Sequence, residues 1–85
     1  MASLFVVDIA EYEPIWSCAV GDSDLEVRHV GPYVELRFAD GLTVDRVATG
    51  TRHAVWYSCV GALHDARVEQ FDKTALRIVA DNGEG

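Results

Sequence analysis

The chain has 85 residues, of which 49% are hydrophobic and 25% are charged, and its formal net charge at pH 7 is -7. This length accommodates one small domain, residues 1–85, and this composition argues against intrinsic disorder. The acidic balance disfavours direct binding to nucleic-acid phosphates, and the longest apolar runs, residues 4–7 and 54–57, are too short to span a membrane.

Two segments in the first third of the chain have the composition of strands. Residues 4–9 and 25–30 are rich in valine and other residues that favour extended structure. The second segment reaches Gly31-Pro32, which must form a turn or a bend because proline cannot donate to a β-ladder. Residues 15–20, after Pro14, are apolar, and their pattern does not decide between helix and strand.

The middle of the chain predicts a hairpin. Residues 33–38 and 42–47 alternate apolar and polar side chains on either side of Ala39-Asp40-Gly41. A three-residue loop with Gly41 in the left-handed conformation keeps one face apolar, which a two-residue loop does not. This loop pairs Phe38 with Leu42 and Leu36 with Val44.

Residues 51–64 show a helical period instead. Five apolar residues fall on a single stripe, and Thr51 is a suitable N-cap. The stripe consists of Val55, Trp56, Cys59, Val60 and Leu63. Gly61 and the β-branched residues lower the helix propensity, but we expect one helix here, with Trp56 in the core.

A second hairpin is predicted near the C-terminus. With residues 72–74 as its loop, Val68 faces Ile78 and Glu69 faces Arg77. Residues 81–85 have no apolar anchor and are expected to fray.

These elements predict an α+β fold, with an antiparallel sheet of about five to six strands built from two hairpins and covered by one helix. The alternative is a small all-β barrel, which requires the helix prediction to fail. A shift of 40 residues also aligns Trp16 with Trp56 and Arg37 with Arg77. Since about three identities arise by chance over such an overlap, the sequence leaves an internal duplication open.

The chain carries few signs of catalytic or metal chemistry. Cys59, His64 and Asp65 are the most site-like group, but a spacing of five turns Cys59 and His64 about 140° apart on a helix. The cysteines and histidines have no recognised metal-binding spacing, and no glycine-rich phosphate loop precedes a helix. We therefore predict no catalytic residue, no metal site and no cofactor, and we favour a protein that is not an enzyme.

The N-terminal region lacks the features of a signal peptide. There is no Lys or Arg before Arg28, and the apolar run at residues 4–7 is short. We therefore expect a cytoplasmic protein whose two cysteines, Cys18 and Cys59, are unpaired and buried.

Aromatic residues suggest where a partner binds. Tyr12 and Trp16 flank Pro14 in an irregular segment, and we predict that they contact a partner. The expected function is a small acidic protein-binding domain (an inhibitor, an antitoxin-like regulator or an accessory subunit), which forms a homodimer through a sheet edge or a helix face. The alternatives are a small-molecule binding or enzymatic domain that acts as a homo-oligomer, and a nucleic-acid mimic.

Overall fold

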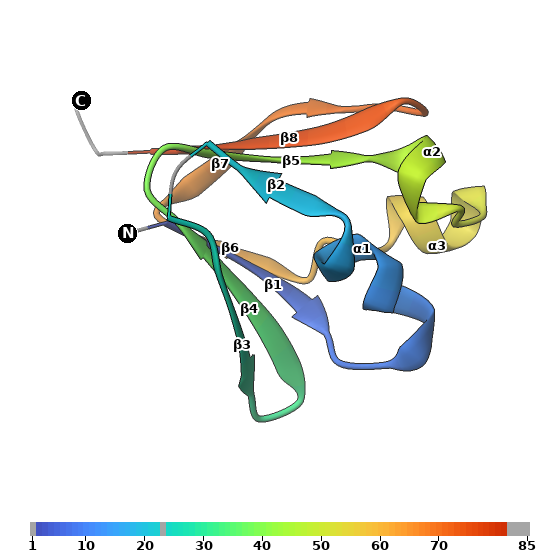
Figure 1. Cartoon of the computed structure of the whole chain (residues 1–85), viewed down its shortest axis with the longest axis horizontal. Coiled ribbons are helices and arrows are strands. Elements are labelled where there is room, and N and C mark those ends of the chain that lie inside the picture. Colours follow the sequence, from blue (N-terminus) through green and yellow to red (C-terminus); the bar gives the residue numbers. More distant parts are fainter. Residues whose placement is uncertain (1, 23, 82–85) are drawn as a thin grey trace.

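The computed structural model describes residues 2–22 and 24–81 and consists mostly of antiparallel strands (Figure 1). Over these residues, eight strands form two four-stranded sheets, with the order β3-β4-β1-β6 in sheet A and β2-β5-β8-β7 in sheet B. The strands are β1 (Ala2–Val7), β2 (Ala19–Gly21), β3 (Glu26–Val30), β4 (Tyr33–Phe38), β5 (Gly41–Asp45), β6 (Ala62–His64), β7 (Ala66–Phe71) and β8 (Ala75–Ala80). The expected single sheet is therefore wrong, and so is the barrel, because the two sheets do not close on each other.

The helices are short and lie together at one end of the molecule, where the two sheets diverge (Figure 1). They are η1 (Ala10–Tyr12), α1 (Glu13–Ser17), α2 (Arg46–Thr49) and α3 (His53–Tyr57). Ile15 of α1 and Trp56 of α3 are buried, so these two helices pack against the core. No helix within the described residues has the length and apolar character that a membrane crossing requires.

The core lies between the two sheets. Alternate side chains of the central strands are fully buried because successive residues of a strand point to opposite faces. Leu4 and Val6 come from β1, and Leu36 and Phe38 come from β4. Sheet B supplies Leu42, Val44, Leu76 and Ile78.

The hairpin predicted around Asp40-Gly41 is wrong. Phe38 pairs with Ala2 in sheet A, whereas Gly41 pairs with Val79 in sheet B, so the chain crosses from one sheet to the other over residues 39–40. The apolar faces of β4 and β5 are both buried, as predicted, but they face the interior from separate sheets. The alternation of apolar and polar residues identifies which face of a strand is buried, but it does not determine which strand lies beside it.

The single helix over residues 51–64 is also wrong, because α3 ends at Tyr57 and β6 follows. The Ser58 hydroxyl donates to the carbonyl oxygens of Ala54 (2.8 Å) and Val55 (3.2 Å) at the end of α3. Gly61 donates its N–H to the Phe5 carbonyl at 2.8 Å, and a Cβ at this position would lie 2.8 Å from the same oxygen. This close approach to β1 pulls the segment into sheet A instead of a helix.

Other predicted elements are confirmed with changed bounds. The strands expected at residues 4–9 and 25–30 are β1 and β3, and Gly31-Pro32 forms the turn between β3 and β4. Residues 15–20 divide between the end of α1 and the start of β2. Of the expected tail at residues 81–85, only Asp81 is described, and its N–H donates to the Asp65 carbonyl at 2.8 Å.

The C-terminal hairpin is confirmed in its loop and in one of its two pairs. Val68 lies opposite Ile78, but a bulge between Val68 and Gln70 places Gln70, not Glu69, opposite Arg77. Glu69 still reaches Arg77, with 3.4 Å between Oε1 and Nε. The predicted ion pair therefore forms from a different register.

The two halves of the chain have a similar order of elements, which is what an internal duplication would produce. A shift of 40 residues carries β1 onto β5, β4 onto β8, and α1 onto α3. The strand orders of the two sheets correspond: β3-β4-β1 of sheet A becomes β7-β8-β5 of sheet B, and a short strand ends each sheet, β6 in sheet A and β2 in sheet B. Each sheet thus contains three strands from its own half of the chain and one short strand from the other half.

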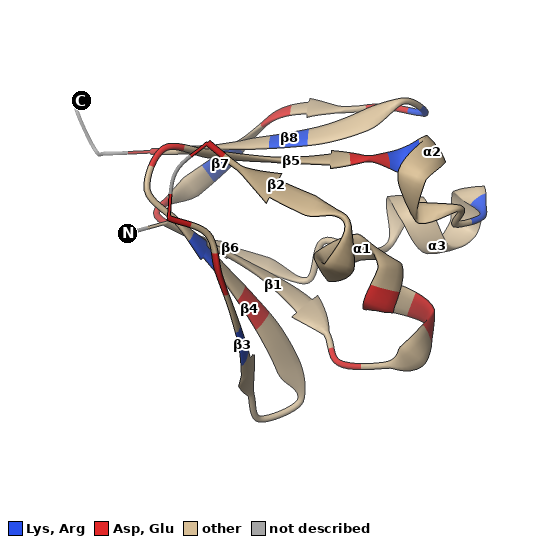
Figure 2. Ribbon diagram, viewed as in Figure 1, with Lys and Arg blue, Asp and Glu red and all other residues tan. Residues whose placement is uncertain are grey.

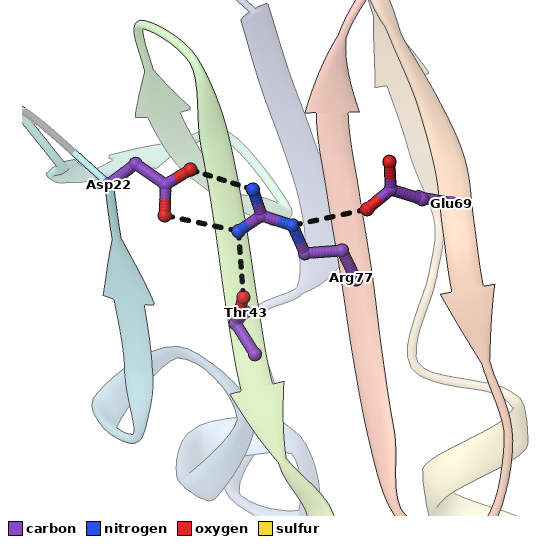
Figure 3. A network of polar contacts seen from close by, with 4 residues as sticks. All are labelled: Asp22, Thr43, Glu69 and Arg77. Carbon is purple, nitrogen blue, oxygen red and sulfur yellow. Dashed lines mark hydrogen bonds and ion pairs between the residues drawn. The ribbon is translucent and has the colours of Figure 1, made fainter.

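Equivalent arginines hold the outer faces of the two sheets. Arg77 of β8 donates to both carboxylate oxygens of Asp22 (3.1 and 2.7 Å) and to the Thr43 hydroxyl (2.9 Å), and it pairs with Glu69 (Figure 3). One guanidinium therefore links the edge strand β7 to β5 and to the residue that follows β2. Arg37, its equivalent on β4, lies 3.8 Å from Glu26 of the edge strand β3.

Candidate interaction surface

Tyr12 and Trp16, the residues predicted to bind a partner, lie at the margin of the core. Both are half-buried and pack against buried residues, but they point to different neighbours. The Tyr12 hydroxyl lies 2.8 Å from that of Ser58, close to α3. Trp16 contacts the ring of His29 edge-on, with 6.2 Å between ring centroids.

Trp16 therefore connects α1 to the edge strand β3. His29 is largely exposed, and its Nδ1 lies 2.8 Å from Oδ2 of Asp8. The Asp8 carboxylate and the Trp16 ring thus fix the His29 side chain at the end of β3. Sequence reasoning missed His29, although it found the tryptophan beside it.

The outer face of sheet A carries an apolar cluster, Phe5, Val7, Val30 and Tyr33, which we call the sheet A patch. Tyr33 lies opposite Val7 on one side and Val30 on the other, so these three side chains share one face. Phe5 contacts Tyr33 edge-on, with ring centroids 6.2 Å apart. Val30 and Tyr33 remain 42% and 38% exposed, which is typical of a surface available to a partner.

Charged side chains continue the same face beyond the sheet A patch. Glu26 and Arg28 of β3 lie opposite Arg37 and Glu35 of β4, so each cross-strand pair joins opposite charges. Glu35 also accepts a hydrogen bond from the buried Ser3 hydroxyl at 2.7 Å. The face therefore presents an ordered charge pattern next to an apolar surface.

The strand β3 is the best-developed free edge in the described part of the chain. It has five residues in unbroken register with β4, and all five are exposed. The other three edges are blunted, because β2 and β6 have only three residues each and β7 contains a bulge. Val27, in the middle of β3, is 44% exposed.

The composition of residues 26–30 is itself a signal for this edge. The segment reads Glu-Val-Arg-His-Val, so β3 has charged or polar residues at three of its five positions. A central strand buries at least one apolar face, and this segment cannot do so. Such a composition is typical of an edge strand.

A cleft of about 500 Å³ lies at the helical end of the molecule. The lining residues come from two segments: Ala10, Glu11 and Pro14 from the first, and residues 49–52, Ala54 and Val55 from the second. The cleft thus offers one acidic and one basic side chain beside apolar surface.

Acidic residues are distributed over loops, helices and both sheets, with Lys and Arg among them (Figure 2). Asp22 and Glu69 pair with Arg77, and Glu26 pairs with Arg37. The guanidinium of Arg77 lowers the pKa of Asp22 chiefly through its hydrogen bonds. Interspersed cations of this kind do not favour a phosphate mimic, which requires a continuous acidic face.

The residues considered for catalysis differ in burial: Cys59 lies in the core, whereas His64 and Asp65 are exposed. Cys59 is buried, and burial raises the pKa of its thiol to about 11, so the reactive thiolate is suppressed. His64 lies on β6 and its Nε2 is 3.3 Å from the Asp65 carboxylate, with both side chains largely exposed. Neither cysteine forms a disulfide, but Cys18 is only half-buried. Within residues 2–22 and 24–81, no three of the residue types that bind metals are grouped.

No family model, no curated protein and no solved structure matches this chain significantly.

Proposed function

We propose that the chain is a small acidic protein-binding domain that engages its partner along β3. The observation that carries this proposal is the free β3 edge, which is regular, exposed over its whole length and flanked by the sheet A patch. A strand of a partner can add to such an edge through main-chain hydrogen bonds, while the adjacent side chains supply specificity. Trp16 packs against His29 of β3. We therefore propose that Trp16 contributes to partner binding by positioning this edge strand.

A photoreactive benzophenone amino acid that replaces Val27 tests this proposal in the cells that express the chain. Val68 provides a matched control, because it is also a valine on an edge strand and is 42% exposed, against 44% for Val27. We expect protein adducts from position 27 and few from position 68, where the bulge of β7 blunts the edge. Equal yields at the two positions, or no adducts at position 27, would refute the proposal.

A second candidate function, binding of a small molecule, is favoured by the cleft between η1–α1 and residues 49–55. Its lining includes the charged residues Glu11 and Arg52 and apolar surface from Pro14 and Val55, which suits a small zwitterionic or polar ligand. An NMR screen of such compounds would support this function if the amide signals of residues 49–55 shift while those of β3 do not. A screen in which no compound shifts residues 49–55 would count against it.

A further inference from the structure

The main-chain groups on the free edge of β3 follow from its pairing with β4. Partners in an antiparallel ladder alternate between pairs that exchange hydrogen bonds and pairs that do not. The two-residue turn at Gly31-Pro32, with Gly31 at a φ of 59°, makes Val30 and Tyr33 a hydrogen-bonding pair. Counting back along the strand, Arg28 and Glu26 also bond to β4, so the N–H and C=O groups of Val27 and His29 point outward.

These outward groups restrict how two copies of β3 can pair about a twofold axis. The residues that bond across the new ladder must be those with outward groups, which leaves registers centred on Val27, Arg28 or His29. The register centred on Arg28 places two arginines opposite each other, and like charges directly opposite are unfavourable. The register centred on His29 places Arg28 opposite Val30 and Glu26 opposite Pro32 in the turn, so it forms no pair of opposite charges.

The register centred on Val27 instead places opposite charges next to each other across the interface. Glu26 then lies opposite Arg28 of the second copy, and the symmetry forms this pair twice. Since Arg28 already faces Glu35, and Glu26 already faces Arg37, each row reads Glu35, Arg28, Glu26, Arg37 across four strands from the two copies. The charges alternate along the whole row, which is the pattern that cross-strand pairing favours.

We propose that β3 pairs with β3 of a second copy in this register, so that sheet A continues into an eight-stranded sheet across the dimer. This inference rests on the proposed function, because it names the partner that the β3 edge receives. Two Val27 side chains meet at the axis, and Leu25 of the second copy lies opposite His29, close to the Trp16 ring. The sheet A patches of the two copies lie on the same face of the joined sheet.

Charge exchange at the two positions tests the register. Glu26→Arg places two arginine pairs in the interface, and Arg28→Glu places two glutamate pairs there. Each variant alone should weaken self-association by about tenfold or more, because two favourable cross-strand pairs become two unfavourable ones. An equimolar mixture of the two variants should associate again, because each substituted side chain then faces the substituted side chain of the other variant, which has the opposite charge. The two unmodified side chains, Arg28 of one variant and Glu26 of the other, also face each other in the mixed dimer.

The readout is solution mass by sedimentation, compared with the monomer mass of 9.3 kDa. Glu69→Arg and Arg67→Glu on β7 provide matched controls. Glu69→Arg disturbs Arg77 much as Glu26→Arg disturbs Arg37, but neither control lies on β3. Both controls should keep the mass of the unmodified chain. Failure of the mixture to associate, or dimers of either single variant as tight as those of the unmodified chain, would overturn the proposal.

A measurement on the unmodified chain covers the case in which a variant does not fold. In a mixed sample of isotope-labelled and unlabelled chain, the methyl groups of Val27 should show intermolecular NMR contacts to Val27 itself. Absence of these contacts, or a monomer mass at about 100 µM, would overturn the dimer. If the photoreactive residue at position 27 then captures a different protein, the protein-binding function stands without the dimer; if it captures nothing, both proposals fail.

Discussion

Truncation of Trp56 tests the assignment of the core at the helical end of the molecule. The side chain is fully buried, and its ring contacts Phe71 with 5.7 Å between centroids. Its Nε1 donates to the Asp72 carbonyl at 2.7 Å, so Trp56 also holds the loop between β7 and β8. One residue of α3 thus packs the interior and braces the C-terminal hairpin.

The expected magnitude follows from these contacts. Replacement of a buried tryptophan by alanine costs about 3 to 5 kcal/mol. A domain of this size has a free energy of unfolding of roughly 4 to 13 kcal/mol. Because 1 kcal/mol lowers the Tm of such a domain by about 4 to 8 °C, Trp56→Ala should lower the Tm by about 12 to 40 °C.

Thermal and urea unfolding, followed by circular dichroism, measure this loss. Trp56→Phe is the matched variant, because it keeps an aromatic ring near Phe71 and removes the N–H, and it should lose about 1 to 2 kcal/mol. Trp16→Ala should lose less than Trp56→Ala, because Trp16 is only half-buried. The reasoning is refuted if Trp16→Ala unfolds the chain while Trp56→Ala melts within a few degrees of the unmodified protein.

Two further predictions concern ionisable groups. With a pKa of about 11, the Cys59 thiol is ionised in about one molecule in a thousand at pH 8. Iodoacetamide should therefore label Cys18 much faster than the buried Cys59 in the folded chain. Similar labelling rates would contradict the burial of Cys59. Asp72 accepts hydrogen bonds from the Thr74 hydroxyl and from the N–H groups of Thr74 and Ala75, and these bonds hold its pKa well below the ordinary value. Its carboxylate therefore stabilises the fold above the unfolded pKa of about 4, and this contribution is lost as the pH falls toward the lower folded pKa. Asp72→Asn should make the decrease of Tm between about pH 4 and pH 2 less steep. An unchanged slope would show that protonation of Asp72 does not cause this decrease.

The strands could be predicted from the sequence because alternation reports burial directly. Leu36 and Phe38 are buried as their period of two indicates, and so are Leu42 and Val44. The same alternation is satisfied whether β5 lies beside β4 or faces it from a second sheet. The sequence near Asp40-Gly41 favours a hairpin, and the choice between the two arrangements depends on β1 and β8, which are distant in sequence.

The helix prediction failed for a related reason. Trp56 and Cys59 are both buried, so the apolar stripe over residues 51–64 identified real core residues. The backbone after Tyr57 follows another constraint, the contact of Gly61 with Phe5, which no local pattern reports. The sequence singled out Trp16 because it lies in an irregular segment. Its contact with His29 could not be predicted, because only the fold brings the two residues together.

The exchange of short strands between the two halves has a consequence for how the chain folds. Sheet B needs β2 from residues 19–21, and sheet A needs β6 from residues 62–64, so neither sheet is complete until segments far apart in sequence have met. Contacts of this kind slow folding, because loop closure costs entropy before the contacts form. During synthesis, β1 lacks its partner β6 until β6 has left the ribosome. Once the chain is folded, the loss of either half of the chain removes a strand from the sheet of the other half. Opening should therefore be nearly all-or-none, with slow hydrogen exchange spread over the central strands of both sheets.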